Sequence, residues 1–326
     1  MYDVVITDYI APPADIEEQV LGGLARLRCL QARSFRQLFG QIENAHALIV
    51  FHEISIPAEV IGVLARCRII VRAGAGFDNI DLDAARARGI MVCNVPDYGV
   101  DEVADHAMAL MLACQRGIVQ TERRLRASLS PWDYRAVAPV FRLADAIMGI
   151  IGLGRIGTAM ALRCKALKMN VLACDPYVRP GVDKALGVTL VGLEELLRRS
   201  DVVSLHVPLT EETRAMIDAR ALAQMKPTAI LINTARGAVV DVEALAAALQ
   251  KRRLAGAGID VLPHEPPEAA SPLVRLWQSD ADPPISLVLT PHSAFYSEAS
   301  LAEMRSKAAR EVASALAGGP LRSRVI

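Results

Sequence analysis

The stretch Ile-Met-Gly-Ile-Ile-Gly-Leu-Gly-Arg-Ile-Gly, residues 147–157, decides the fold of this chain. Its first five residues form an apolar run of strand length, and Gly152, Gly154 and Gly157 follow at the spacing of a turn into a helix. Gly152 permits a tight turn, Gly154 lets the backbone approach phosphate groups, and Gly157 lets the helix pack closely on the strand. The pattern therefore predicts a strand, turn and helix that bind the pyrophosphate of a dinucleotide at the helix N-terminus.

The residues after this turn agree with that prediction. A helical pattern over Thr158 to Leu167 leads to a second apolar strand, Asn170 to Cys174, and then to Asp175. An acidic residue roughly 20 positions after the first glycine is typical of a carboxylate that binds the adenosine ribose. Because a carboxylate repels a 2′-phosphate, Asp175 favours NAD over NADP, with Arg179 as the nearby cation that could bind such a phosphate instead.

Short apolar runs alternate with helical patterns along the whole chain. Continuous apolar runs are typical of parallel strands that are covered by helices on both faces. We therefore expect an α/β protein with two doubly wound domains, a Rossmann NAD-binding domain inserted in a flavodoxin-like substrate domain. The predicted strands cover residues 4–6, 47–50, 69–71, 147–151, 170–174, 202–205, 229–232, 257–259 and 287–289, with crossover helices at 14–26 and 57–66.

Helical periodicity also suggests the domain boundaries. Hydrophobic residues recur on one helical face from Val100 to about Arg126, ahead of a turn-rich excursion from Ser128 to Pro139. We expect residues 99–293 to form the NAD-binding domain, and residues 1–98 with 294–326 to form a discontinuous substrate-binding domain. An amphipathic helix from about Glu298 to Ala317 is expected to return to that second domain, and Pro263 to Pro284 is predicted as a loop or short-helix region.

Composition narrows the possible classes of protein. The 326 residues are 52% hydrophobic and 22% charged, which is typical of a globular chain, and 36 basic and 36 acidic side chains cancel. That balance argues against nucleic acid or an anionic membrane as a partner, and no apolar run reaches the roughly 18 residues of a membrane span. No export signal follows Met1, and the six cysteines are scattered without metal-ligand spacing. We expect a cytoplasmic protein with reduced thiols and without a metal.

Three polar side chains, Arg236, Glu265 and His292, lie after predicted strands in the second half of the chain. Reducing a 2-oxo acid requires a hydride, a proton for the developing alkoxide and a cation for the carboxylate and ketone. The planar fork of Arg236 suits the last task, and the imidazole of His292 can donate and recover a proton. Glu265 would hold that imidazole in one tautomer and favour its protonated form, unless it is a solvated loop acid. His46 and His106 are interpreted as structural or surface histidines.

These residues lie in three motifs that occur in order. They are Asn233 to Gly237, Gly258 to Val261 followed by Glu265-Pro266, and Thr290 to Ala294. The motifs resemble the signature blocks of the D-isomer-specific 2-hydroxyacid dehydrogenases. The resemblance implies a homodimer that reversibly reduces a small 2-oxo acid with NAD as cofactor, in which Arg236 binds the carboxylate and carbonyl and His292 is the acid and base. It further implies that the cofactor is bound by Gly152, Gly154, Arg155, Ile156, Gly157, Asp175, His206, Pro208, Thr213, Thr234, Ala235, Asp260 and Ala294.

Other motifs narrow the resemblance to one branch. Val71 to Asp81, Cys93 to Pro96 and Phe295 to Glu298 are similar to those of the C-terminal-binding-protein-like branch, whose animal members are transcriptional corepressors. That implies substrate contacts from Arg72, Gly74, Ala75, Gly76 and Phe295, the last of which replaces a tryptophan of the animal members. Arg72 could instead cap a domain edge. The alternative functions are a D-3-phosphoglycerate dehydrogenase and a cofactor-gated corepressor-like binding protein.

Overall fold

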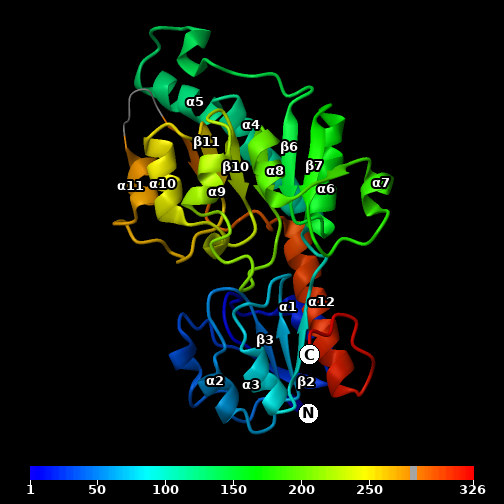
Figure 1. Cartoon of the computed structure of the whole chain (residues 1–326). Helices are drawn as coiled ribbons and strands as arrows, with labels where there is room; N and C mark the ends of the chain where they lie inside the picture. The colour runs from blue at the N-terminus through cyan, green and yellow to red at the C-terminus, as the bar shows by residue number, and fades with distance from the viewer. Residues whose placement is uncertain (280–284) are drawn as a thin grey trace. The chain divides into compact units, whose positions relative to one another are not determined.

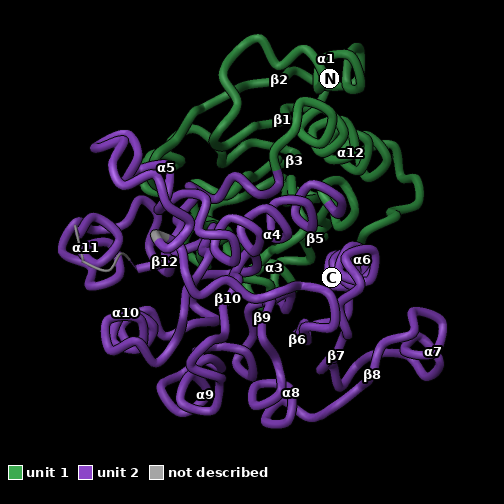
Figure 2. Tube along the Cα trace, turned by 90° about the horizontal axis from the view of Figure 1, so that it is seen from above, with its two compact units in different colours: residues 1–99, 296–326 green, residues 100–295 purple. Residues whose placement is uncertain are grey.

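The computed structural model describes residues 1–279 and 285–326, which divide into two compact units (Figure 2). The first unit comprises Met1–Gly99 and Tyr296–Ile326, and the second comprises Val100–Phe295. The last five residues of the predicted loop region, 280–284, lie outside the described residues. Each unit is built on one parallel sheet with helices against it, so the predicted α/β fold class is confirmed.

The first unit contains a five-stranded parallel sheet in the order β2-β1-β3-β4-β5, the order of flavodoxin-like folds. The apolar runs of β3 and β4 are completely buried, as expected for central strands. Two strands, β2 and β5, were not predicted. They are the two edge strands of this sheet, and β2 is partly exposed and has no apolar run. The strands are β1 (Tyr2–Ile6), β2 (Ala25–Cys29), β3 (Ala47–Val50), β4 (Ile69–Arg72) and β5 (Met91–Asn94).

The helices of the first unit are shorter than expected, except for the last one. The helix predicted over 14–26 is present but shorter: it ends at Leu21, and Ala25 already pairs with Tyr2 in the sheet. The C-terminal helix α12 packs against α1, β3 and β4, where its Arg305 forms an ion pair with the fully buried Glu17. The elements are α1 (Asp15–Leu21), η1 (Phe35–Leu38), α2 (Ala58–Val63), α3 (Leu82–Ala87) and α12 (Glu298–Leu316).

The second unit contains a seven-stranded parallel sheet in the order β12-β11-β10-β9-β6-β7-β8. Its first strand, β6, pairs with both β7 and β9, so the chain reverses its direction of winding between β6 and β9. In such sheets ligands bind at the carboxyl ends of the strands beside this switch point. The strands are β6 (Ile147–Ile151), β7 (Asn170–Cys174), β8 (Thr189–Leu190), β9 (Val202–Leu205), β10 (Ile230–Asn233), β11 (Gly256–Ile259) and β12 (Ser286–Leu289).

Helices cover both faces of this larger sheet. The single helix predicted from Val100 to Arg126 is wrong: Gly117, at a left-handed φ of 59°, separates two helices. A Cβ at Gly117 would lie 2.8 Å from the side chain of Val137, so the break also lets the following excursion pack closely. The elements are α4 (Val100–Gln115), α5 (Ile118–Ala127), η2 (Tyr134–Val137), α6 (Arg155–Ala166), α7 (Val182–Leu186), α8 (Leu193–Arg199), α9 (Ala219–Gln224), η3 (Gly237–Val239), α10 (Val242–Gln250) and α11 (Pro272–Gln278).

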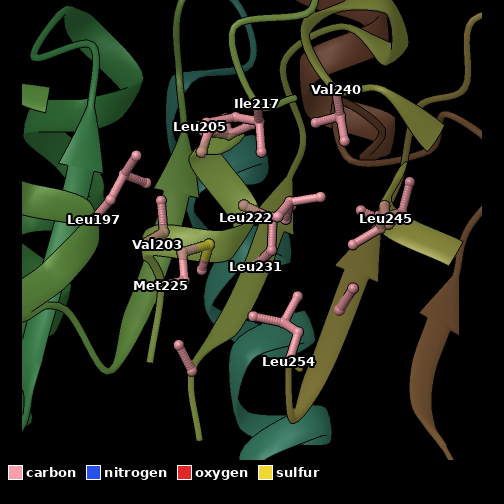
Figure 3. Packing of buried hydrophobic residues seen from close by; sticks show 14 of the residues in the cluster. Leu197, Val203, Leu205, Ile217, Leu222, Met225, Leu231, Val240, Leu245 and Leu254 are labelled. Carbon is pink, nitrogen blue, oxygen red and sulfur yellow. The ribbon is translucent and has the colours of Figure 1, made fainter. Parts of the chain in front are cut away.

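The core of the second unit has one layer on each side of the sheet. On one side, side chains from α8, α9, α10 and α11 pack on alternate residues of the central strands, among them Leu205 and Leu231 (Figure 3). On the other side, α4 and α6 pack against β6 and β10. Figure 1 shows α6 and α8 to α10 along the sheet. This packing holds the strands rigidly, so the loops at their carboxyl ends start from fixed positions.

Candidate active site

The three predicted catalytic residues follow three neighbouring strands of the larger sheet. Arg236 follows β10, Glu265 follows β11 and His292 follows β12, and these strands are paired in parallel. Because parallel neighbours end at the same edge, the three loops start side by side at the carboxyl edge of the sheet.

Glu265 and His292 are in direct contact. Their side chains meet through Oε2 and Nδ1 at 2.7 Å, while Oε1 of Glu265 accepts a hydrogen bond from the amide of Leu262 at 2.8 Å. An ionised carboxylate only accepts, so Nδ1 carries the proton and Nε2 lies on the opposite edge of the ring. The ring of Phe295 meets the imidazole edge to face, with centroids 6.3 Å apart. The orientation of the imidazole is therefore set by the carboxylate.

The loop that carries Arg236 packs against the loop that carries Glu265. The buried side chain of Asn233 bonds both to the amide of Ala235 and to the carbonyl of Arg236, which shapes this turn. A Cβ on Gly237 would lie 1.9 Å from the carbonyl carbon of Leu262, so only glycine allows the two backbones to approach this closely. The guanidinium is half-buried and donates to the carbonyl of Ala235 at 2.8 Å.

The glycine turn has the geometry that the sequence pattern requires. Gly152 has φ +91°, and a Cβ there would lie 2.7 Å from the carbonyl oxygen of His206 on the adjacent loop. A Cβ on Gly157 would lie 2.0 Å from the carbonyl oxygen of Gly152, whereas one on Gly154 would meet nothing within 4 Å. Helix α6 begins directly afterwards, at Arg155 and Ile156, without a side-chain cap. Its first amides and the space at Gly154 fit a pyrophosphate.

Asp175 is tied to the glycine turn. Its Oδ2 accepts a hydrogen bond from the amide of Leu153, and its Oδ1 accepts one from the amide of Tyr177, both at 2.8 Å. Each carboxylate oxygen has a second lone pair, so the group can still accept bonds from two ribose hydroxyls. The hydroxyl of Tyr177 donates to Glu212 at 2.7 Å.

Two buried polar atoms at the same edge lack a hydrogen-bond partner within the described part of the chain. They are Nδ1 of His206 and Oγ1 of Thr234. Burial lowers the pKa of His206 to about 4, so its ring is neutral at neutral pH, and its Nε2 lies 2.9 Å from Oγ of Ser204. Buried polar atoms are normally satisfied, so these two fit a polar group of a bound cofactor. In the next loop, Oγ1 of Thr213 donates to the carbonyl of Pro208.

Asp260, which follows β11, holds the loop after β12. Its carboxylate is buried and accepts hydrogen bonds from the hydroxyl of Thr290 and the amides of Ser293 and Ala294. The hydroxyl of Thr290 also lies 2.9 Å from Nε2 of His106, on α4. The interpretation of His106 as a structural or surface residue missed this contact, for which the sequence holds no local signal.

The predicted substrate residues other than Phe295 lie in the first unit. Arg72 ends β4, is 7% exposed, and donates from Nη1 to the carbonyl of Ala73. Gly74 has φ +142°, and a Cβ there would lie 1.4 Å from Nη1 of Arg72, so the guanidinium lies against the glycine backbone. Asn94 donates to the carbonyl of Ala75 and so anchors the turn that ends at Gly76.

Sequence reasoning missed Asp8, at the carboxyl end of β1. Its carboxylate accepts hydrogen bonds from the hydroxyl of Thr7 and the amides of Phe51 and Glu53, and burial raises its pKa. The segment that it holds carries His52, whose ring lies 5.0 Å from that of Tyr9. The available signal was the pair of polar residues, Thr7 and Asp8, that follows the apolar end of β1.

Within the described residues, no group of three or more histidine, cysteine, aspartate or glutamate side chains is arranged to bind a metal ion. No helix within that part of the chain is long and apolar enough to cross a membrane.

Residues 108–294 match the family model described as D-isomer specific 2-hydroxyacid dehydrogenase, NAD binding domain. The D-3-phosphoglycerate dehydrogenase of Mycobacterium leprae is 38% identical over 293 residues, which are 90% of this chain and 52% of that protein. The chain thus spans about half the length of the curated relatives it matches.

Two solved structures are similar over nearly the whole chain. A protein from Thermus thermophilus is 34% identical with a TM-score of 0.87, and the match covers 99% of this chain and 100% of that one. The D-lactate dehydrogenase from Aquifex aeolicus, solved with NAD and lactic acid, is 30% identical with a TM-score of 0.87 and covers 97% of this chain and 96% of that one.

Proposed function

Because this chain belongs to the D-isomer-specific 2-hydroxyacid dehydrogenase family, we propose that it reversibly reduces a small 2-oxo acid with NAD as its cofactor. The observation that carries the proposal is the contact between Glu265 and His292, at the edge where Arg236 and the glycine turn also lie. The arrangement combines a proton donor, a fixed cation and a dinucleotide site on one rigid sheet.

Each side chain has one task in this reaction. When bound, the nicotinamide supplies or accepts the hydride. Arg236 pairs with the substrate carboxylate and polarises the carbonyl, since a guanidinium stays charged and presents parallel donors. His292 donates the proton to the developing alkoxide and takes it back in the reverse reaction. Glu265 holds the ring with Nδ1 protonated, so Nε2 is the atom that exchanges the proton.

We also propose a preference for NAD over NADP. The carboxylate of Asp175 lies against the glycine turn, so a 2′-phosphate at the ribose would meet its negative charge. Arg179, which is exposed in the same loop, is the cation that could weaken the preference. Asp175→Ala should lower the ratio of the affinity for NADH to the affinity for NADPH, both measured by nucleotide fluorescence. An unchanged ratio would contradict the assignment of Asp175 to the ribose.

For the substrate we propose a second cation at Arg72, with backbone amides of the Gly74 to Gly76 turn facing the carboxylate. The near burial of Arg72 and its fixed place against Gly74 support this role. Phe295 beside His292 supports an apolar wall, in line with the C-terminal-binding-protein-like motifs. Phosphoglycerate oxidation is the second candidate, favoured by the name of the Mycobacterium leprae relative.

A substrate panel tests the proposal. Purified protein should oxidise NADH with glyoxylate, hydroxypyruvate or a longer 2-oxo acid, with NADPH run in parallel and D-3-phosphoglycerate plus NAD as the competing assay. His292→Ala should lower turnover far more than it weakens NADH binding. Wild-type turnover in that variant would refute the acid role. An NADH-dependent protein partner in a pull-down, without turnover, would favour the corepressor-like alternative.

We propose that the protein is a homodimer and works in the cytoplasm. Large hydrophobic side chains are exposed along α5 and the segment between it and β6, which supports contact with a second copy: Ile118, Leu129, Trp132, Tyr134 and Phe141. The six cysteines are all free, which supports a reducing compartment. Light scattering should give the mass of a dimer, and Trp132→Arg should shift it toward the monomer.

A further inference from the structure

We propose that His106 is a positioning residue for the loop that carries His292. It acts through the hydroxyl of Thr290 on the carboxylate of Asp260, and that carboxylate fixes the loop. The consequence for turnover rests on the proposed function, in which His292 is the acid and base.

A buried aspartate makes several of the hydrogen bonds that hold the loop after β12. Asp260 is 2% exposed, and its carboxylate accepts hydrogen bonds from the amides of Ser293 and Ala294, each at 3.0 Å. Its backbone carbonyl accepts the amide of His292 at 2.8 Å. His292 itself has φ +52°, a left-handed conformation that non-glycine residues keep only where surrounding contacts enforce it. The backbone position of His292, from which its imidazole reaches Glu265, therefore depends on how firmly Asp260 is held.

His106 reaches this carboxylate from a different element. It lies on α4, which packs against β10, β11 and β12, and its side chain is 25% exposed. Its Nε2 is 2.9 Å from Oγ1 of Thr290 and 3.6 Å from Oδ1 of Asp260. The hydroxyl of Thr290 in turn donates to that same Oδ1 at 2.6 Å. The three groups form a chain from the helix to the loop.

The direction of the hydrogen bonds assigns the tautomer. A hydroxyl has a single proton, and Thr290 gives it to Asp260, so Nε2 of His106 must be the donor to the hydroxyl oxygen. The histidine thus prevents the hydroxyl from turning away and supplies a polar partner near a carboxylate that burial leaves with little water. Without His106, the Thr290 hydroxyl can rotate, and the buried carboxylate of Asp260 loses part of the polar interactions that offset its removal from water.

The test compares His106→Leu with His106→Gln. Leucine removes the donor, whereas the amide nitrogen of glutamine can take the place of Nε2. The matched control is Asp105→Asn, since Asp105 is the neighbour of His106 on α4 and pairs with Arg163 at the surface. Amide hydrogen exchange of peptides that contain residues 290–294 measures the loop directly, and kcat, KM and NADH affinity are measured beside it.

We expect His106→Leu to speed exchange at Ser293 and Ala294 about tenfold, in line with the loss of one buried hydrogen bond. Turnover should fall about tenfold, because a loosened loop misplaces the proton donor His292. KM for the oxo acid should stay nearly unchanged, because Arg236 still binds the substrate carboxylate. His106→Gln should recover most of both effects, and the control should show neither.

Wild-type exchange at residues 290–294 in His106→Leu would overturn the proposal, whatever happens to turnover. If no 2-oxo acid is reduced at all, the proposed function fails, but the exchange experiment still decides the role of His106. If His106→Leu does not fold, Thr290→Val removes the bridging hydroxyl and should speed exchange in the same peptides. Unchanged exchange in a folded Thr290→Val would equally overturn the proposal.

Discussion

The variant Glu265→Gln tests what the negative charge of Glu265 contributes to catalysis, because glutamine has nearly the same size and shape but no charge. The native group accepts two hydrogen bonds, from the amide of Leu262 at 2.8 Å and from Nδ1 of His292 at 2.7 Å. Glutamine has one carbonyl oxygen, so its amide nitrogen must face one of these two donors. The variant therefore loses the negative charge and one of the two bonds, although its side chain has nearly the same size.

The expected magnitude follows from the exposure of the pair. A hydrogen bond to a charged group contributes about 1.5–3 kcal/mol. The side chain of Glu265 is 34% exposed, so water screens it and the lower end applies. A loss of about 1.5 kcal/mol in the transition state slows a reaction roughly tenfold. Reduction needs a protonated imidazole, so kcat for reduction should fall about tenfold, and kcat for oxidation should fall less.

Initial rates with NADH and with NAD measure the two directions, and NADH fluorescence measures binding. The control is Glu268→Gln, which replaces an exposed acid in the same loop. It should leave the rate of reduction, the rate of oxidation and the affinity for NADH unchanged. Reduction within twofold of wild type in Glu265→Gln would refute the reasoning, because the charge would then contribute nothing to proton donation.

Acid should destabilise the protein through His206, because burial lowers its folded-state pKa to about 4, below the ordinary 6.5. As the pH falls from 6.5 to 4, the unfolded chain binds more protons than the folded protein, and the free energy of unfolding falls by up to about 3 kcal/mol. In urea titrations at several pH values, His206→Gln should show a smaller fall of this free energy over the same range. Gly157→Ala would place a carbon 2.0 Å from a backbone oxygen, so we expect the free energy of unfolding to fall by about 1–3 kcal/mol and NADH to bind more weakly. Gly192→Ala, with nothing within 4 Å but at the N-cap of α8, should leave NADH binding unchanged. Arg305→Ala should lower the free energy of unfolding, measured in urea, by about 3–5 kcal/mol, because it leaves the fully buried Glu17 without its partner. The double variant Glu17→Leu/Arg305→Leu buries no unpaired charge and should lose less, so an equal loss in it would contradict this reasoning.

The sequence predicted the elements whose signals are local. The run at 147–151, the glycines after it and the strand at 170–174 lie where the pattern put them, because a buried strand and a tight turn each need particular residue types within a few positions. Strand β2 was missed and the helix at 14–26 was predicted too long, because pairing with β1, not an apolar run, makes Ala25–Cys29 a strand. The break at Gly117 was missed because a helical periodicity runs across it.

The sequence by itself determined the fold class and placed Arg236, Glu265 and His292 directly or shortly after predicted strands, since strand periodicity and short motifs are local properties of the chain. Only the tertiary structure decided which atoms meet: Nδ1 of His292 on Glu265, and Nε2 of His106 on Thr290, a residue 184 positions away. A hydrogen bond needs a donor and an acceptor within about 3 Å. When they come from different elements, no spacing in the sequence encodes that distance, and the packing of α4 against the sheet sets it.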